Sequence, residues 1–200
     1  MSVPIPAGWR RESEEVYYAA PGLTLVDDER IDILKRLAVG TERRRCRLCA
    51  HRDSDDALHE MLIVHARDAY VRPHLHLDKS ESLHVIEGTA TLVEFDEEGG
   101  PRRLEALGAP GSGLTFYYRM PQGCYHMLLI DSDWFVFHET VQGPFERQKT
   151  RLAPWSPEDH EDQAKTAFLD ELRALARSLG SEPPDEEASG IISTSRNALA

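Results

Sequence analysis

The chain has 200 residues, enough for one ordinary domain with short extensions. Its 23 Lys and Arg against 35 Asp and Glu give a formal charge of −12. This charge argues against broad binding to nucleic acid or to an anionic membrane, because both need a basic face. No apolar run approaches the roughly 20 residues of a membrane span.

The number of cysteines and the first residues of the chain indicate in which cellular compartment the protein is expected. Three cysteines cannot all pair within the chain. The first twelve residues contain no continuous apolar stretch of the signal-peptide kind. We therefore expect a cytoplasmic protein with reduced thiols.

Turn signals and periodicity divide the chain into four parts. Residues 1–42 are expected to form an N-terminal extension, with irregular backbone and then a short helix that Asp27 or Asp28 caps and Gly40 ends. Residues 43–155 alternate short apolar runs with turn signals, which predicts an all-β sandwich or barrel. The runs are 60–66, 83–87, 89–95, 114–118, 125–130 and 134–140.

The remaining two parts are a helix and a tail. Ser156 and Pro157, followed by acidic residues, predict a helix start, and Gly180 predicts its end. We interpret the helix over 156–180 as a packing or dimerisation element. Residues 181–200 are rich in Ser, Pro and Glu and predict a disordered tail.

Four side chains of metal-ligand type occur at spacings that bring them to one point. His74 and His76 are two residues apart in a strand-like segment, so their imidazoles point to the same face. Glu81 follows a short polar stretch, and His126 begins a later apolar strand after the turn at 121–123. Three neutral imidazoles and one carboxylate suit one divalent transition metal: Fe, Mn, Ni, Zn, Co or Cu. On an octahedral ion they would leave two positions open, as catalysis requires.

These spacings resemble the two motifs of the cupin superfamily. The first motif is His-x-His, three or four residues, Glu, six residues and Gly, and here it ends at Gly88. The second is Pro-x-Gly, two residues and His, and here it begins with Pro121 and Gly123. The chain departs from the motifs at Asp68, Thr115 and Ile130, which are turn or packing positions and not ligands.

The resemblance implies a fold and an assembly. Cupins are double-stranded β-helices, jelly-roll-like small barrels that hold the metal inside. Such barrels commonly pair, so a homodimer is implied, with the C-terminal helix contributing to the contact.

A narrower resemblance is to the WbuC-type cupin-fold metalloproteins, and it spans roughly residues 43–160. It implies a metal-binding barrel whose ligand is related to sugars, because some members are encoded with surface-polysaccharide biosynthesis. The segments that carry the resemblance are 45–51, 72–76, 79–81, 85–88, 95–99, 143–145 and 153–158.

Basic residues ahead of the barrel are candidate ligand contacts. Arg45, Arg47 and His51 share one face of a predicted strand, and two guanidiniums there would grip a carboxylate or phosphate. The alternative is an exposed basic edge strand that discourages edge pairing. Tyr117 and Arg119, near the expected barrel mouth, are further candidates.

A Cys-x-x-Cys pair lies in the same basic strand. Cys46 and Cys49 have the spacing of a redox pair or of half a zinc site. No thioredoxin-like pattern surrounds them, and the periodicity of a strand places them on opposite faces. We therefore weigh a role in redox chemistry or zinc binding below a structural one.

Three functions remain open from the sequence. The first is an enzyme that uses the metal to polarise a small sugar or sugar-derived acid, as an isomerase, epimerase or lyase, in polysaccharide biosynthesis. The second is a non-haem Fe(II) dioxygenase acting on a small acid, and the third a non-catalytic binding or sensor barrel. The expected partner is an anionic or sugar-like small molecule, and neither nucleic acid nor membrane. The sequence does not identify the catalytic acid or base.

Overall fold

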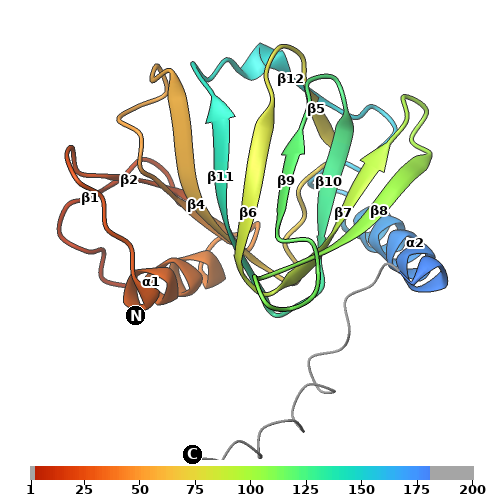
Figure 1. Cartoon of the computed structure of the whole chain (residues 1–200), viewed down its shortest axis with the longest axis horizontal. Helices are drawn as coiled ribbons and strands as arrows, with labels where there is room; N and C mark the ends of the chain where they lie inside the picture. Colours follow the sequence, from red (N-terminus) through yellow and green to blue (C-terminus); the bar gives the residue numbers. More distant parts are fainter. Residues whose placement is uncertain (1–2, 181–200) are drawn as a thin grey trace, which may run out of the picture.

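The computed structural model describes residues 3–180. The tail predicted to be disordered, 181–200, lies outside the described residues. Within residues 3–180, twelve strands and two α-helices follow in chain order, with one 3₁₀ turn, Arg147–Lys149; Figure 1 shows their arrangement. The elements are β1 Trp9–Arg11, β2 Val16–Ala19, α1 Asp28–Val39, β3 Arg45–Cys49, β4 Leu58–Ala66, β5 His74–His76, β6 Glu81–Glu87, β7 Thr89–Phe95, β8 Pro101–Gly108, β9 Tyr117–Met120, β10 Tyr125–Ile130, β11 Trp134–Gln142, β12 Thr150–Leu152 and α2 Asp162–Leu179.

The strands form two sheets that enclose the barrel interior. One sheet has the order β1-β2-β3-β4-β11-β6-β9 and the other β12-β5-β10-β7-β8. Between β4 and β11 the chain passes back and forth between the sheets: β4, β6, β9 and β11 belong to the first sheet, and β5, β7, β8 and β10 belong to the second. This winding is that of the cupin-type double-stranded β-helix, and the predicted all-β fold is confirmed.

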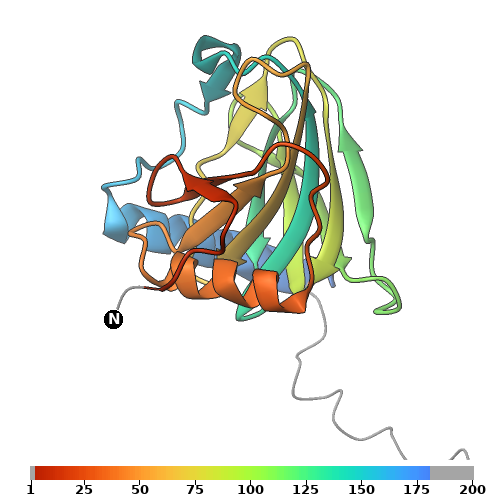
Figure 2. The ribbon, with the colours of Figure 1, turned by 90° about the vertical axis from the view of Figure 1, so that its left-hand side faces the viewer.

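Each helix covers the outer face of one sheet (Figure 2). Leu34 of α1 packs with Leu48 and Val64 of the seven-stranded sheet. Leu172 of α2 packs with Met127 of the five-stranded sheet. Because both faces of the central strands are covered, β10 is buried at every position, which explains its continuous apolar sequence.

The helix boundaries agree with the sequence in three of four cases. Asp27 caps α1, since its carboxylate accepts the backbone N–H of Arg30 at 3.1 Å, and Gly40 follows the last turn. Gly180 ends α2 in the left-handed conformation, with φ 66°. The predicted start of α2 at Ser156 is wrong, because the Ser156 hydroxyl donates to the Ala153 carbonyl instead of capping a helix.

The N-terminal extension is more regular than predicted. β1 and β2 form a hairpin, and β2 pairs in parallel with β3, so this segment extends the seven-stranded sheet. The run predicted at 114–118 is a strand only from Tyr117 onward. β8 was not predicted, because it is an edge strand that begins with exposed residues, two of them arginines, and so lacks an apolar run. No helix within residues 3–180 is long and apolar enough to cross a membrane.

Candidate metal centre and cavity

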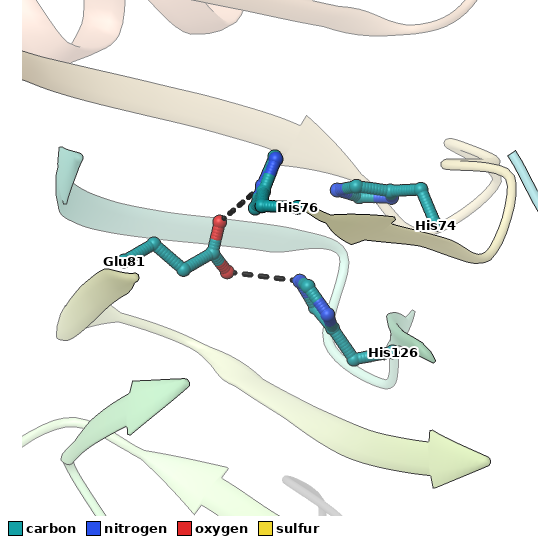
Figure 3. Close-up of side chains that lie close together, drawn as sticks. All are labelled: His74, His76, Glu81 and His126. Atoms are coloured by element: carbon teal, nitrogen blue, oxygen red, sulfur yellow. Dashed lines mark hydrogen bonds and ion pairs between the residues drawn. The ribbon is translucent and has the colours of Figure 1, made fainter. Parts of the chain in front are cut away.

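Three strands from the two sheets bring the predicted ligands together (Figure 3). His74 and His76 are the first and last residues of β5, and His126 on β10 lies directly opposite His74 in the register. Glu81 begins β6 in the other sheet and points across the interior toward the histidines. One ligand atom from each of the four residues lies within 4.8 Å of the others, as the sequence predicted.

The carboxylate of Glu81 joins two of the imidazoles. Its Oε2 lies 3.0 Å from His76 Nε2, and its Oε1 lies 3.0 Å from His126 Nε2. The His74 ring completes the group, with its centroid 4.7 Å from that of His126. Two ring nitrogens therefore contact the carboxylate, and the third ring lies beside them.

The opposite ring nitrogens are held from behind. His74 Nδ1 donates to the Arg72 carbonyl at 3.0 Å, and His126 Nδ1 donates to the Cys124 carbonyl at 2.9 Å. His76 Nδ1 lies 3.3 Å from the Thr150 hydroxyl. A carbonyl accepts only from a protonated Nδ1, which leaves the Nε2 lone pair directed inward. Such outer hydrogen bonds are typical of histidines that bind metals, so the donor set fits a divalent transition metal.

Electrostatics keep the cluster ready to bind a cation. Burial, followed by the nearby His126, lowers the pKa of His74 to about 4, so this ring is neutral. Burial acts to raise the pKa of Glu81, but the charge and hydrogen bond of His126 hold it well below its ordinary value. The same pairing raises the pKa of His126 against the effect of burial. A bound metal would replace the His126 proton as the partner of the carboxylate.

The cluster faces a cavity of about 720 Å³. This volume is within the range of small-molecule sites. Glu139 on β11 is a lining residue that sequence reasoning missed, and it faces inward between Met61 of β4 and Leu83 of β6. Burial, then the charge of Glu81, raises the pKa of Glu139 to about 8. The detectable signal was a glutamate at an inward position of the alternating run Phe135, Phe137, Glu139, Val141.

A tyrosine side chain lies in the same interior as Glu139. Tyr118 on β9 lies opposite Leu83 and lines the cavity. Burial, then the charges of Glu81 and Glu139, holds the pKa of Tyr118 well above its ordinary value, so the phenol is neutral.

The predicted ligand contacts divide into two groups. Arg45, Arg47 and His51 line the cavity. Tyr117 and Arg119 flank the inward-facing Tyr118 on β9 and point away from the cavity. Tyr117 is 51% exposed, and the Arg119 guanidinium donates to the Ser80 hydroxyl at 2.8 Å. The structure therefore does not bring these two residues to the wall of the cavity.

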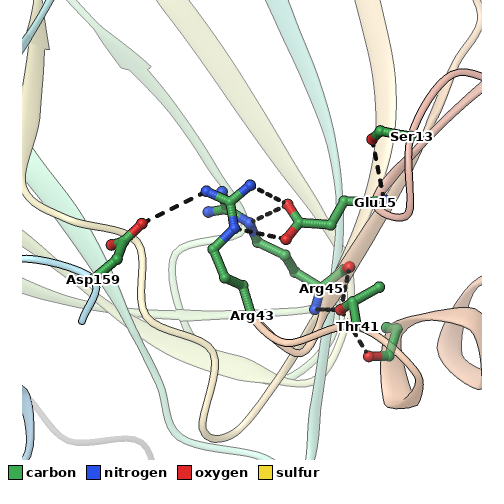
Figure 4. Close-up of polar contacts among 7 residues, drawn as sticks. Ser13, Glu15, Thr41, Arg43, Arg45 and Asp159 are labelled. Atoms are coloured by element: carbon green, nitrogen blue, oxygen red, sulfur yellow. Dashed lines mark hydrogen bonds and ion pairs between the residues drawn. The ribbon is translucent and has the colours of Figure 1, made fainter. Parts of the chain in front are cut away.

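Arg45 belongs to a cluster that carries its own counterion (Figure 4). Glu15 accepts from Arg45 Nε at 3.0 Å and from Arg43 at 2.6 and 2.7 Å. Arg43 also lies 3.7 Å from Asp159, in the loop before α2. Burial acts to raise the pKa of Glu15, but the two arginines lower it. We call Glu15, Arg43, Arg45 and Asp159 the arginine cluster.

The two cysteines of β3 are buried and lie on opposite faces of the strand. Cys46 lies in the core beneath α1, whereas Cys49 lies in the barrel interior. Burial raises the pKa of Cys46 to about 12 and that of Cys49 to about 11, so both thiols stay protonated. Their positions on opposite faces prevent a shared site.

The chain is similar to one described family and to several solved structures. Residues 26–106 match a family described as a domain of unknown function, DUF6016. A search of curated proteins found no match. A solved protein from Shewanella oneidensis is 14% identical over 68% of this chain and 81% of its own, with a TM-score of 0.43. A conserved protein with a double-stranded β-helix domain from Klebsiella pneumoniae is 15% identical over 55% and 79%, with a TM-score of 0.42. Streptomyces Pac13, solved with uridine, is 12% identical over 56% and 80%, with a TM-score of 0.43.

Strand order and side-chain geometry define the class of this protein. It has a cupin-type double-stranded β-helix fold with a candidate metal centre of three histidines and one glutamate.

Proposed function

We propose that the protein is a metal-dependent enzyme that acts on a small anionic or sugar-like molecule. The observation that carries the proposal is the opening of the four-residue cluster into a cavity that also contains the carboxyl group of Glu139. A purely structural metal site would be closed by its ligands and surrounded by core. When bound, a divalent transition metal would supply Lewis-acid polarisation of a ligand oxygen.

Glu139 is the proposed acid–base residue. Its carboxyl group forms no hydrogen bond or ion pair with any residue in 3–180, so it is free to exchange a proton with a ligand. Met61 and Leu83 flank it in the sheet and limit its hydration. A carboxyl group beside a polarised oxygen supports proton transfer at the neighbouring carbon. This chemistry corresponds to isomerisation, epimerisation or elimination.

The ligand class follows from the charges on the cavity wall. Arg47 lines the cavity and forms no ion pair within the described part of the chain, which favours an oxyanion or a sugar-derived acid. The resemblance to WbuC-type proteins supports a place in polysaccharide biosynthesis. A cytoplasmic homodimer is part of the same proposal.

Metal content and proton exchange test the proposal together. Protein purified without a His-tag or chelator should hold about one transition metal per chain. Incubation in D₂O with panels of aldoses, ketoses, sugar phosphates and hydroxy acids should place deuterium at a carbon of one substrate, as read by mass spectrometry. Glu139→Gln should keep the metal and reduce exchange by about 10²-fold or more.

A matched control and three outcomes make the test decisive. Glu60→Gln changes the same residue type on the neighbouring strand at an exposed position, and it should leave exchange unchanged. Absence of metal even after reconstitution contradicts the proposal. One iron per chain with oxygen consumption on a small acid would favour a dioxygenase instead. Tight ligand binding without product would favour a sensor barrel.

A further inference from the structure

Lys79 is a buried cation that forms no direct ion pair within the described residues. Only 6% of this residue is exposed, and it lines the cavity. It forms no ion pair or hydrogen bond with any residue between 3 and 180. The ring of Phe145 lies over the ammonium group, with its centroid 5.6 Å from Nζ, and the charge acts at longer range on Asp78 and Glu139.

This lack of a partner is unusual in an acidic protein. Other lysines of the chain are paired: Lys35 with Glu87 at 2.6 Å, and Lys149 with Asp78 at 2.7 Å. Burying an ammonium group without a counterion is unfavourable, and proteins usually pair such groups. A position that keeps this cost indicates a partner that the chain itself does not provide.

The surroundings of Lys79 place its charge beside the metal centre. Lys79 precedes the candidate metal ligand Glu81 by two residues, just before the start of β6. Its charge contributes to lowering the pKa of His59 and opposes the raised pKa of Glu139, so the ammonium group acts on both cavity residues. Phe145, in the loop after β11, borders the same part of the cavity.

His59 adds a second polar atom without a partner. This residue is 4% exposed, its Nε2 has no hydrogen bond within the described residues, and its ring stacks on His51 at 4.1 Å. Burial is the main cause of the lowered pKa of His59, so the ring is neutral. A neutral imidazole is able to donate one N–H to an oxyanion without adding charge.

We propose that Lys79 is the anion-binding residue of the cavity, and that the ligand carries a carboxylate or phosphate that pairs with its ammonium group. The remaining oxygens of the ligand then lie toward the four-residue cluster and Glu139. This inference rests on the proposed function and adds a substrate class to it: small hydroxy or keto compounds with at least one oxyanion. An uncharged sugar would leave Lys79 unpaired.

Calorimetric titration of the metal-loaded protein tests this assignment. Inorganic phosphate and malonate are titrated separately, because they represent the two possible oxyanions. Lys79→Met should weaken binding of the preferred anion about tenfold or more, since it removes a charge-assisted contact. Lys79→Arg should keep most of the affinity. Lys35→Met removes the same charge on α1 and should leave the affinity unchanged.

Thermal stability separates ligand binding from a structural role. Without added anion, Lys79→Met should melt at the same temperature as the wild type or higher, because an unpaired buried charge is removed. Wild-type affinity for both anions in Lys79→Met overturns the inference, and so does a wild type that binds neither at millimolar concentration. If the wild type lacks metal, the proposed function fails, and the same titrations on the metal-free protein still decide the role of Lys79.

Discussion

The metal centre and the arginine cluster are two polar groups on one cavity. They differ in whether their charged and polar atoms already have partners within the protein. In the metal centre, the rings of His76 and His126 contact the carboxylate of Glu81, His74 lies beside them, and hydrogen bonds from behind hold the rings (Figure 3). In the arginine cluster, Glu15 already engages both Arg43 and Arg45 (Figure 4). The first arrangement converges on a point that suits a cation, whereas the second is complete without a ligand.

The two clusters also connect different parts of the chain. The metal centre joins strands of the two sheets, where register fixes each side chain. The arginine cluster joins the turn between β1 and β2, the segment leading into β3 and the loop before α2. We therefore expect the metal centre to serve binding and the arginine cluster to fasten the N-terminal hairpin to the barrel.

The largest expected effect is the loss of metal on removing one ligand. His76→Ala deletes an imidazole that pairs with Glu81 and is held by Thr150. Bound metal should fall from about one atom per chain to near zero by elemental analysis, because three donors remain where four converged. Circular dichroism should show an unchanged β-sheet spectrum. Full metal occupancy in the variant would show that the ligands are misassigned.

The next largest effect is a loss of stability without a loss of metal, which distinguishes the arginine cluster from the metal centre. Glu15→Gln leaves Arg43 and Arg45 without their carboxylate, and their partial exposure moderates the loss. The free energy of unfolding should fall by about 1–3 kcal/mol, or roughly 3–9 °C in Tm. Metal content should not change.

A control in the same hairpin sharpens this result. Glu12→Gln removes an exposed carboxylate that pairs with Arg10, and it should alter stability by less than about 0.5 kcal/mol. A Glu15 variant as stable as the wild type would mean that the cluster does not fasten the hairpin. Loss of metal in that variant would mean that the two clusters are coupled.

The shared face of His74 and His76, the cap of α1 and the main strands were predictable because their signals are local. His74 and His76 share a face through the period of a strand, and Asp27 caps α1 through a contact three residues away. The apolar sequence of β10 likewise follows from burial on both faces. Such features need no knowledge of distant partners.

Residues that depend on distant partners were missed or misplaced. Glu15 meets Arg43 across 28 residues, and sheet register alone brings Glu139 into the cavity. Neighbouring residues of β9 point to opposite faces of the sheet. Tyr118 therefore lines the cavity, whereas Tyr117, the predicted candidate, does not. The burial of Lys79 beneath Phe145 depends on a loop more than 60 residues further along the chain, which no local pattern reveals.

The smallest effect concerns acid sensitivity beside the arginine cluster. His65 lies opposite Arg45 in the register between β3 and β4, and its Nδ1 has no partner within residues 3–180. Burial, then the charges of Arg45 and Arg47, lowers the pKa of His65 to about 3 from an ordinary value of 6.5. Between these two values the unfolded chain binds more protons at His65 than the folded protein does. The contribution to stability is therefore complete above pH 6.5 and decreases as the pH falls toward 3.

Urea unfolding at pH 7.5 and 5.5 measures this contribution. The wild type should lose about 1 kcal/mol more than His65→Gln over this interval, because only the wild type must keep a buried imidazole neutral. His160→Gln, at an exposed position, should follow the wild type. Equal losses in wild type and His65→Gln would mean that water reaches His65 beside the arginine cluster. Polar atoms beside the cluster would then be satisfied by water and not by the chain, and the contrast between a complete and an incomplete polar group would not hold.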